Sequence, residues 1–307
     1  MLLYFEKILK NECKVCYYRL KTKCKYYVTE TLYRVDTRSA SQKVGKAMAT
    51  IITIGNQKGG VGKTTTAVNL AAAYARLKKR VLLIDLDPQT DASKYLNHRR
   101  DNAPYMFDVF KAFVAGEEID ISAVIRRNND EKVDYIPTDA RLDMVDTLLA
   151  EVPFRETVLK QILDNPIINA YDYVFFDMSS RFASLLLNAL VASDFVVIPV
   201  QPQEWSYDGI TKMLANISAV KKSANSRLEL GGILLNMCNR TVLSKSVIAA
   251  VKAKYPQYTL KTELPMLVEV PESQNARQSL VNTAGSKIGK MYLQCAKELI
   301  AKENGAK

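Results

Sequence analysis

The feature that most restricts the fold is a loop of glycines and lysines between an apolar run and a helix-forming stretch. The apolar run is Ile51–Ile54, and the loop reads Lys58-Gly-Gly-Val-Gly-Lys63-Thr-Thr. A buried strand that turns through glycines into a helix leaves unpaired N–H groups at the turn, and such groups bind phosphate. The glycines permit positive φ angles, Lys63 can reach the β- and γ-phosphates, and the Thr64 hydroxyl can join a Mg²⁺ shell. The loop therefore predicts a site for a nucleoside triphosphate.

The pattern of apolar runs predicts the fold around this loop. After residue 47 short apolar runs alternate with longer helical patterns, and several runs are apolar at every position. Strands of that kind are covered on both faces, which favours a mainly parallel sheet flanked by helices in one doubly wound α/β domain. Ligands of such sheets lie at the carboxyl ends of the strands. Strands are expected at Ile51–Ile54, Val81–Ile84, Val133–Ile136, Tyr173–Phe176, Phe195–Val200 and Gly232–Leu235, and helices from Thr64 to about Leu77 and from about Ser206.

Three aspartates stand at the ends of predicted strands. Asp85 and Asp87 lie in Val81-Leu-Leu-Ile-Asp85-Leu-Asp87-Pro-Gln89, and Asp177 ends the run that begins at Tyr173. Carboxylates at this edge can hold Mg²⁺ through water or orient the water that attacks a γ-phosphate. Phosphoryl transfer needs mainly positioning and charge stabilisation, so a carboxylate that holds water is sufficient. A simple helix-capping turn at Asp87-Pro88 is the alternative interpretation.

The loop departs from the common G-x-x-x-x-G-K-[ST] pattern, because Gln57 stands at the first glycine position and Lys58 follows it. With this early lysine the segment resembles the deviant Walker A loop of the ParA/MinD family of P-loop ATPases, above all its ParA (Soj-like) DNA-partition members. The resemblance covers roughly residues 48–300. It implies the P-loop NTPase fold, ATP and Mg²⁺ as ligands, and hydrolysis of ATP to ADP and phosphate. The loop residues that it implies for nucleotide binding are Lys58, Gly59, Gly60, Val61, Gly62, Lys63, Thr64 and Thr65.

The resemblance also implies roles for the carboxylates. The family's D-x-D-P-Q motif falls on Asp85 and Asp87, so Asp87 is expected to position the hydrolytic water and Asp85 to lie nearer the metal shell. Asp177 corresponds to the Walker B aspartate and is expected to bind Mg²⁺ through water, together with Thr64. The family continues as D-x-P-P after this aspartate, whereas Met178-Ser179-Ser180 follows here. That difference leaves open how rigid the next loop is.

Two further implications concern the base and a second subunit. Asn236, at the end of a predicted strand, and Pro271, in a late loop that begins at Pro265, are expected to contact the base. In the family two ATP-bound subunits face each other, and the early lysine reaches the phosphates of the partner. Lys58 is therefore expected to act in trans, with Lys63 and Asp87 as the other catalytic residues, in an ATP-dependent homodimer with Gly59 and Gly60 at its interface.

The function that the resemblance implies is partition of plasmid or chromosomal DNA. The ATP-bound sandwich dimer would bind DNA without sequence preference, and a ParB-like centromere-binding adaptor would stimulate hydrolysis and release. Such a protein is expected to be cytoplasmic and nucleoid-associated. Scattered basic residues are usually solvated surface charges, but a DNA-binding face would draw on some of them. The candidates are Lys221, Lys222, Lys245, Lys252, Lys254, Arg277, Lys287 and Lys290.

Residues 1–47 differ from the rest of the chain. They carry +7 of the net charge of +11 and three of the five cysteines, with no sustained period of 2 or 3.6. We expect a poorly ordered basic extension, with Met48 as a plausible native start, followed by a P-loop ATPase domain at residues 48–307. The cysteines are odd in number and accompany no secretion signal, which predicts reduced thiols.

The extension also offers a metal-binding alternative. Cys13-x-x-Cys16 and Cys24 are too few for a structural zinc site, which normally takes four ligands. The only histidine, His98, is distant in sequence and is expected to be a solvated loop residue.

Three other functions were weighed against DNA partition. A MinD-like membrane-surface ATPase needs a terminal amphipathic helix; Met291 to Ile300 has Leu293, Ala296 and Ile300 at helical spacing, a stripe that more often packs on its own domain. No stretch approaches the roughly 18 apolar residues of a membrane span. An iron–sulfur reductase needs cysteines near the nucleotide, and none occurs between Cys24 and Cys238. A bacterial tyrosine kinase is expected to carry a C-terminal tyrosine cluster, but only Tyr292 lies in the last stretch.

Overall fold

The computed structural model describes residues 48–118, 120–180, 183–204 and 206–306. The strands are β1 (Thr50–Ile54), β2 (Val81–Leu86), β3 (Arg126–Asn128), β4 (Val133–Ile136), β5 (Tyr173–Met178), β6 (Phe195–Val200) and β7 (Glu229–Leu235). The helices of eight or more residues are α3 (Lys63–Arg76), α5 (Met106–Ala115), α9 (Ala183–Ala192), α10 (Ser206–Ser223), α11 (Val242–Lys254), α12 (Glu269–Ala276) and α13 (Lys287–Ala306). Shorter turns of helix are α4 (Asp91–Tyr95), α6 (Ile121–Val124), η2 (Ala140–Met144), α7 (Val145–Leu148), η3 (Arg155–Thr157), α8 (Val158–Leu163) and η4 (Ile168–Ala170).

The strands form one seven-stranded sheet in the order β3-β4-β2-β5-β1-β6-β7. All neighbouring pairs are parallel except β3 with β4, which is antiparallel. All six predicted strands are present, so the mainly parallel, doubly wound α/β prediction is confirmed. The structure adds β3, which sequence reasoning missed because its three residues, Arg-Arg-Asn, are polar and it pairs on one side only at the edge of the sheet.

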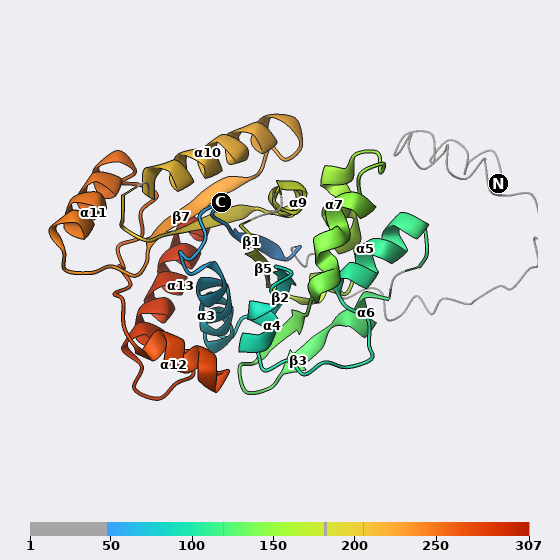
Figure 1. The fold of residues 1–307 in the computed structure, drawn as a ribbon, viewed down its shortest axis with the longest axis horizontal. Coiled ribbons are helices and arrows are strands. Elements are labelled where there is room, and N and C mark those ends of the chain that lie inside the picture. The colour runs from blue at the N-terminus through green and yellow to red at the C-terminus, as the bar shows by residue number, and fades with distance from the viewer. Residues whose placement is uncertain (1–47, 119, 181–182, 205, 307) are drawn as a thin grey trace, which may run out of the picture. The chain divides into compact units, whose positions relative to one another are not determined.

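Helices cover both faces of the sheet (Figure 1). On one face of the sheet, α5, α8, α9 and α10 pack against the strands and bury side chains such as Phe110, Leu190 and Met213. On the other face α3 and α13 supply Leu70, Tyr74 and Leu299 to a second apolar cluster. The central strands are therefore buried on both sides, which is why their sequences are apolar at nearly every position.

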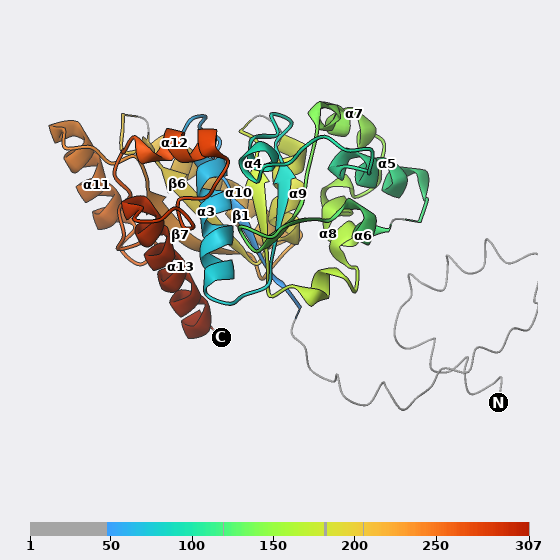
Figure 2. The same ribbon diagram turned by 90° about the horizontal axis from the view of Figure 1, so that it is seen from below.

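The register of the parallel strands brings their polar ends together at one edge. Ile54, the last residue of β1, pairs with Asp177 on β5, and Asp85 on β2 pairs with the same Asp177. The glycine loop follows Ile54, so it lies next to these aspartates. Figure 2 shows α4, α7 and α12 at this carboxyl edge, where α3 also begins.

The predicted helices lie close to their expected bounds. The helix expected from Thr64 to about Leu77 is α3, at Lys63–Arg76, and the helix expected from about Ser206 is α10. The extension, with Cys13, Cys16 and Cys24, lies outside the described residues. The division of the chain at residue 47 stays a prediction.

Candidate functional site

The glycine loop has the backbone of an anion cradle. Gly60 and Gly62 adopt φ angles of 73° and 84°, and Gly62 is the N-cap of α3. A Cβ atom on Gly62 would lie 2.4 Å from Nδ2 of Asn236, whereas one on Gly60 would meet nothing within 4 Å. The open side of the loop at Gly60 and the N-terminus of a fourteen-residue helix provide N–H donors and a favourable dipole for phosphate.

Lys63 is the buried lysine of this loop. It is 8% exposed, and its Nζ donates to the carbonyl oxygen of Lys58 at 3.3 Å. Burial lowers the pKa of Lys63, while the nearby carboxylates of Asp177 and Asp87 act in the opposite direction. Lys63 forms no ion pair within the part of the chain that the structure describes, so a bound phosphate would supply a direct anionic partner for its ammonium group.

Lys58 lies at the front of the loop in a different environment. Its Nζ donates to Oε1 of Gln203 at 3.4 Å in an exposed contact, and its backbone N–H donates to Oδ1 of Asn56 at 2.9 Å. Asn56 in turn donates to the carbonyl of Pro199 at the end of β6. Sequence reasoning missed Asn56 and Gln203, although an asparagine within the loop segment is a typical signal for a side chain that shapes a turn.

Asp177 is the most strongly perturbed carboxyl group of the site. It is fully buried, and neither of its oxygens has a hydrogen bond of ordinary geometry from the described residues, although the Thr64 hydroxyl lies beside it. Burial raises its pKa well above the ordinary value, and the neighbouring Asp85 raises it further. The Thr64 hydroxyl and Lys63 are near enough to favour the charged form. Two buried carboxylate oxygens beside a threonine hydroxyl fit a hydrated divalent cation.

Asp85 differs from Asp177 because its oxygens are already hydrogen-bonded. One oxygen accepts from the backbone N–H of Asp87 at 3.1 Å, and the other accepts from the N–H and the hydroxyl of Ser93 at 2.9 and 2.6 Å. Burial raises the pKa of Asp85 to about 6, although these hydrogen bonds favour its charged form. These hydrogen bonds connect α4 and the backbone of Asp87 to the end of β2.

Asp87 makes a turn with one oxygen and keeps the other available. Its Oδ1 accepts from the N–H of Gln89 at 3.0 Å, and its carbonyl accepts from the N–H of Thr90 at 2.8 Å. The N-cap of α4 is Thr90 and no side-chain hydrogen bond caps that helix, so the helix-capping part of the alternative interpretation is wrong, and what is present at Asp87 is a turn. It does not use Oδ2, which has no hydrogen bond within the described part of the chain, so a turn and a water-holding role are compatible at this residue.

The residues expected to contact the base meet beside the loop. Asn236 and Pro271 line the same pocket of about 350 Å³, together with Thr65 of α3 and an apolar segment at residues 265–268. Asn236 donates from Nδ2 to the carbonyl of Val61 at 2.9 Å, which fixes its side chain against the loop. A flat apolar group attached to a phosphate in the loop would find this pocket adjacent to it.

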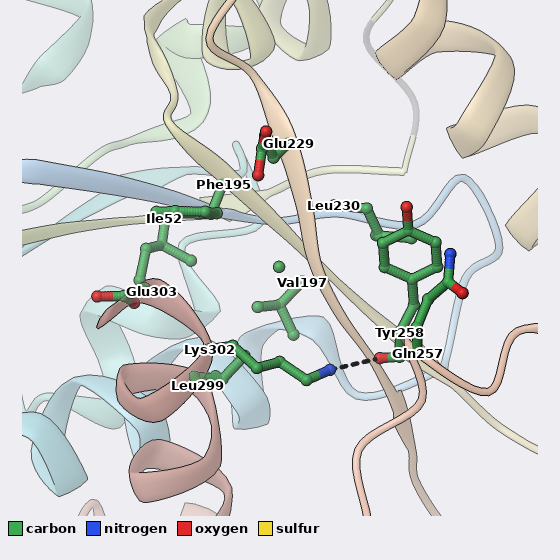
Figure 3. A pocket seen from close by; sticks show the side chains of 11 residues that line it. Ile52, Phe195, Val197, Glu229, Leu230, Gln257, Tyr258, Leu299, Lys302 and Glu303 are labelled. Carbon is green, nitrogen blue, oxygen red and sulfur yellow. Dashed lines mark hydrogen bonds between the residues drawn. The ribbon is translucent and has the colours of Figure 1, made fainter. Parts of the chain in front are cut away.

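A second pocket lies at the other end of the sheet. It has a volume of about 200 Å³ and is lined at the amino ends of β6 and β7 by Phe195 and Glu229, and by Lys302 of α13 (Figure 3). Lys302 donates to the carbonyl of Tyr258 at 3.2 Å, the hydrogen bond drawn in Figure 3. Because the amino ends are opposite to the loop, this pocket is separate from the phosphate site.

Comparison with known proteins agrees with this geometry. A family model described as an AAA domain matches residues 49–230. The sporulation initiation inhibitor protein Soj of Bacillus subtilis is 36% identical over 257 residues, which cover 83% of this chain and 99% of Soj. The chromosome partitioning protein ParA of Caulobacter vibrioides is 34% identical over 260 residues, covering 82% and 94%.

The chain belongs to the ParA/Soj family of P-loop ATPases. A solved structure extends the comparison: cobyrinic acid a,c-diamide synthase of Mycobacterium smegmatis, with a bound ATP analog and magnesium, has a TM-score of 0.70 and 27% identity, covering 84% of this chain and 97% of that one. The family resemblance stated from the loop is thereby confirmed. The residue roles taken from it stay predictions.

Within this ParA/Soj chain the residues predicted to bind nucleotide and metal form one cluster. The loop from Lys58 to Thr65, the three aspartates, Asn236 and Pro271 all lie at the carboxyl edge of the sheet. No three side chains of the His, Cys, Asp or Glu type form a metal site within the described part of the chain. An Mg²⁺ ion here would therefore take most of its ligands from phosphate oxygens and water, as this ion commonly does, and would be held by Asp177 and Thr64.

His98 lies in a loop, as predicted, but the prediction that it is solvated is wrong. Its ring lies half-buried between Tyr105 and Tyr135, with Nε2 3.2 Å and Nδ1 3.1 Å from their hydroxyl oxygens. Both tyrosine rings meet the imidazole edge-to-face. The neighbouring polar residues suggested a solvated loop, and Asn97, Arg99, Arg100 and Asp101 are exposed, but the sequence offers no signal that the ring of His98 contacts two tyrosines.

The stripe on the last helix packs against the domain itself. Ala296 is buried, and Leu293 and Ile300 are partly buried against the apolar cluster that α3 also joins. That stripe is therefore not available to a membrane surface. Within the described ranges, no helix combines the length and apolar character needed to cross a membrane.

Proposed function

We propose that this protein is a ParA-type partition ATPase whose ATP-bound homodimer binds DNA without sequence preference and releases it after hydrolysis. Support for the cargo comes from the chromosome partitioning relatives. Support for the chemistry comes from the carboxyl edge of the sheet. ATP would occupy the glycine loop, with its base in the pocket lined by Asn236 and Pro271.

The observation that carries the proposal is the different environment of the two lysines of the loop. Lys63 is buried beside Asp177 and takes the place of the phosphate-binding lysine. Lys58 is therefore not required to bind the phosphates of its own subunit. Its only side-chain hydrogen bond among the described residues is the exposed contact to Gln203. A lysine at the front of the loop with one weak contact can turn outward to the phosphates of a second subunit.

The reaction at each site then follows from the positions of the side chains. Asp87 holds the attacking water with its available oxygen, and Lys63 and the partner's lysine stabilise the charge that spreads over the transferred phosphoryl group. Asp177 and Thr64 would hold a Mg²⁺ ion, which would supply positive charge beside the phosphates. Asp85 keeps the backbone of Asp87 in place through its hydrogen bond to the N–H of that residue. Hydrolysis removes the γ-phosphate that both subunits share, so the dimer opens.

The DNA-binding face would use only part of the predicted basic set. Lys221 pairs with Glu229 at 3.6 Å, and Lys252 is ion-paired with Glu263. Lys254 lies over the ring of Tyr207 at 5.5 Å. The other five candidates, Lys222, Lys245, Arg277, Lys287 and Lys290, are exposed and form no ion pair within the described ranges. Of these, Lys222 on α10 and Lys245 on α11 are the pair chosen for the first test.

Duplex-DNA binding tests the proposal. The full chain would be mixed with DNA in the presence of ATP, ADP or no nucleotide, across a series of salt concentrations. We expect binding with ATP alone and a steep loss of affinity with salt. The double variant Lys222→Ala/Lys245→Ala should flatten the salt dependence, because each phosphate contact contributes roughly one unit to the slope. Absence of DNA binding in every nucleotide state would refute the cargo.

The adaptor and the location in the cell are parts of the same proposal. A ParB-like centromere-binding protein is expected to raise ATP turnover only when DNA is present, and the ATP-bound protein is expected to lie over the nucleoid. The MinD-like alternative predicts association with liposomes in place of DNA. A sedimentation assay with anionic vesicles distinguishes the two, since the same ATP-bound preparation can be given both surfaces.

A further inference from the structure

A third pocket lies beside α4 and does not share a lining residue with the base pocket. It has a volume of about 340 Å³ and is enclosed by α4 and the chain that follows it on one side, and by residues 138–141 on the other. We refer to it as the α4 pocket. Its volume is at the lower end of the roughly 300–1,000 Å³ that small-molecule sites occupy. Figure 2 shows α4 at the carboxyl edge of the sheet.

The rim of the α4 pocket is cationic. Lys94, Arg100 and Arg141 line it, against the single carboxylate of Asp139. Arg100 is exposed and has no hydrogen bond or ion pair within the described residues. Lys94 has an exposed ion pair with Asp91, and such a pair exchanges readily for another anion, whereas Arg141 is held by both Asp108 and Asp139. The cationic side chains at the rim of the pocket therefore favour binding of an oxyanion.

The floor of the pocket contains an unsatisfied hydroxyl group. Thr138 lines the pocket and is 2% exposed, but its Oγ1 has no hydrogen-bond partner within the described part of the chain. A buried hydroxyl without a partner destabilises a protein unless something supplies one. The backbone N–H of the same residue donates to Oγ of Ser93 at 3.3 Å. The backbone N–H of Thr138 thus has a hydrogen-bond partner, whereas its hydroxyl has none among the described residues.

Ser93 connects this floor to the ATP site. Its N–H and its hydroxyl both donate to Asp85, and Asp85 accepts the N–H of Asp87 with its other oxygen. Three consecutive hydrogen-bonded contacts thus run from Thr138 to the backbone of the residue that is proposed to hold the attacking water. A ligand that fixes Thr138 and α4 would also fix the Asp87 turn.

We propose that the α4 pocket binds a small molecule that carries a phosphate or carboxylate group, and that its occupation changes the rate of ATP hydrolysis through Ser93 and Asp85. The binding step is independent of the proposed DNA-partition function. The effect on hydrolysis rests on that function, because it passes through Asp87. Phosphate and carboxylate share the chemistry that the rim and the floor recognise, and the experiment separates them.

Calorimetric titration of the full chain tests the binding step. The protein is first saturated with ADP and Mg²⁺, so that the glycine loop is filled, and is then titrated with inorganic phosphate or with citrate at constant ionic strength. Thr138→Val is the decisive variant, since it removes the hydroxyl and keeps the shape. We expect it to bind the preferred anion about tenfold more weakly, or about 1.4 kcal/mol, while its melting temperature without anion is unchanged or higher.

Two further variants keep the test interpretable. Thr138→Ser retains the hydroxyl and should bind like the wild type. Arg100→Ala should weaken binding, whereas Arg99→Ala removes the same charge from the next residue, which does not line the pocket, and should not. Equal affinities in the wild type, Thr138→Val and Arg100→Ala would mean an adventitious ion only and would overturn the proposal. A lower melting temperature of Thr138→Val would also overturn it, because the hydroxyl would then have a structural partner.

The effect on hydrolysis is measured separately. Steady-state ATP turnover is recorded with and without the anion that binds, in the wild type and in Thr138→Val. A change in turnover is expected in the wild type alone. If the anion binds but turnover is the same in both proteins, the link through Ser93 is wrong. If the protein hydrolyses no ATP at all, the proposed function fails while the binding result stands.

Discussion

Replacement of Lys58 by alanine should separate stability from catalysis. The structure gives the side chain one hydrogen bond, the exposed 3.4 Å contact to Gln203. The two other contacts at this residue, the N–H donated to Asn56 and the carbonyl that accepts from Lys63, belong to the backbone and survive the substitution. The loss of folding free energy should be about 0.5 kcal/mol or less, because an exposed, long hydrogen bond lies at the low end of the usual range.

Catalysis should suffer far more than stability. A cation supplied in trans to a transferred phosphoryl group contributes roughly 10³-fold or more to turnover in comparable enzymes. Lys58→Ala should therefore fold and bind ATP but lose ATP-dependent dimerisation and nearly all hydrolysis. Lys160→Ala, at an exposed lysine of α8, is the charge-matched control and should have wild-type turnover. Dimerisation is followed by light scattering and hydrolysis by phosphate release.

Mixing two inactive variants distinguishes action in trans from action in cis. Lys58→Ala and Asp87→Ala each keep Lys63 and can bind ATP. In a mixed dimer, the site on the Lys58→Ala subunit has its own Asp87 and receives Lys58 from the other subunit. Each mixed dimer keeps one Lys58 and has one complete site of two, so an equimolar mixture should turn over ATP well above either variant alone, to at most about half of the wild-type rate. If the mixture is as inactive as its components, the trans assignment is refuted.

Three other predictions concern single residues of the domain. Gly62→Ala should destabilise the fold by about 1–3 kcal/mol and abolish nucleotide binding in calorimetry, because a Cβ there meets Asn236 at 2.4 Å at a φ of 84°; Gly116→Ala, at a φ of 68° with nothing within 4 Å, should retain nucleotide binding. Asp177→Asn should lose Mg²⁺-dependent ATP binding with no fall in melting temperature, since it removes one charge from a buried carboxyl pair, and a large fall would contradict that electrostatic interpretation. Burial lowers the pKa of His98 below its ordinary 6.5, so the unfolded chain binds the proton more readily. The contribution of His98 to stability is complete above about pH 6.5 and is lost as the pH falls through the folded-state pKa, so His98→Gln should flatten the acid side of the stability profile in urea titrations, and an unchanged slope would show that another group is responsible.

The fold could be predicted from the chain because its signals are local. Apolar runs of four to six residues mark strands that are buried on both faces, and the three glycines before Lys63 mark the turn into α3. The same signals place Asp85, Asp87 and Asp177 at strand ends, and parallel strands bring such ends to one edge. The short edge strand β3 escaped notice because it has no apolar pattern.

The contacts that tune the site depend on residues far apart in the chain, and only tertiary packing decides them. Gly62 must be a glycine partly because Asn236, 174 positions later, packs against it. Gln203 contacts Lys58, and Ser93 donates two hydrogen bonds to one oxygen of Asp85. Periodicity and motif spacing describe a residue's neighbours along the chain, whereas burial and hydrogen bonding depend on neighbours in space. The loop with its two lysines was therefore evident from the residues alone, and the buried oxygens of Asp177 became evident only when β5 lay between β1 and β2.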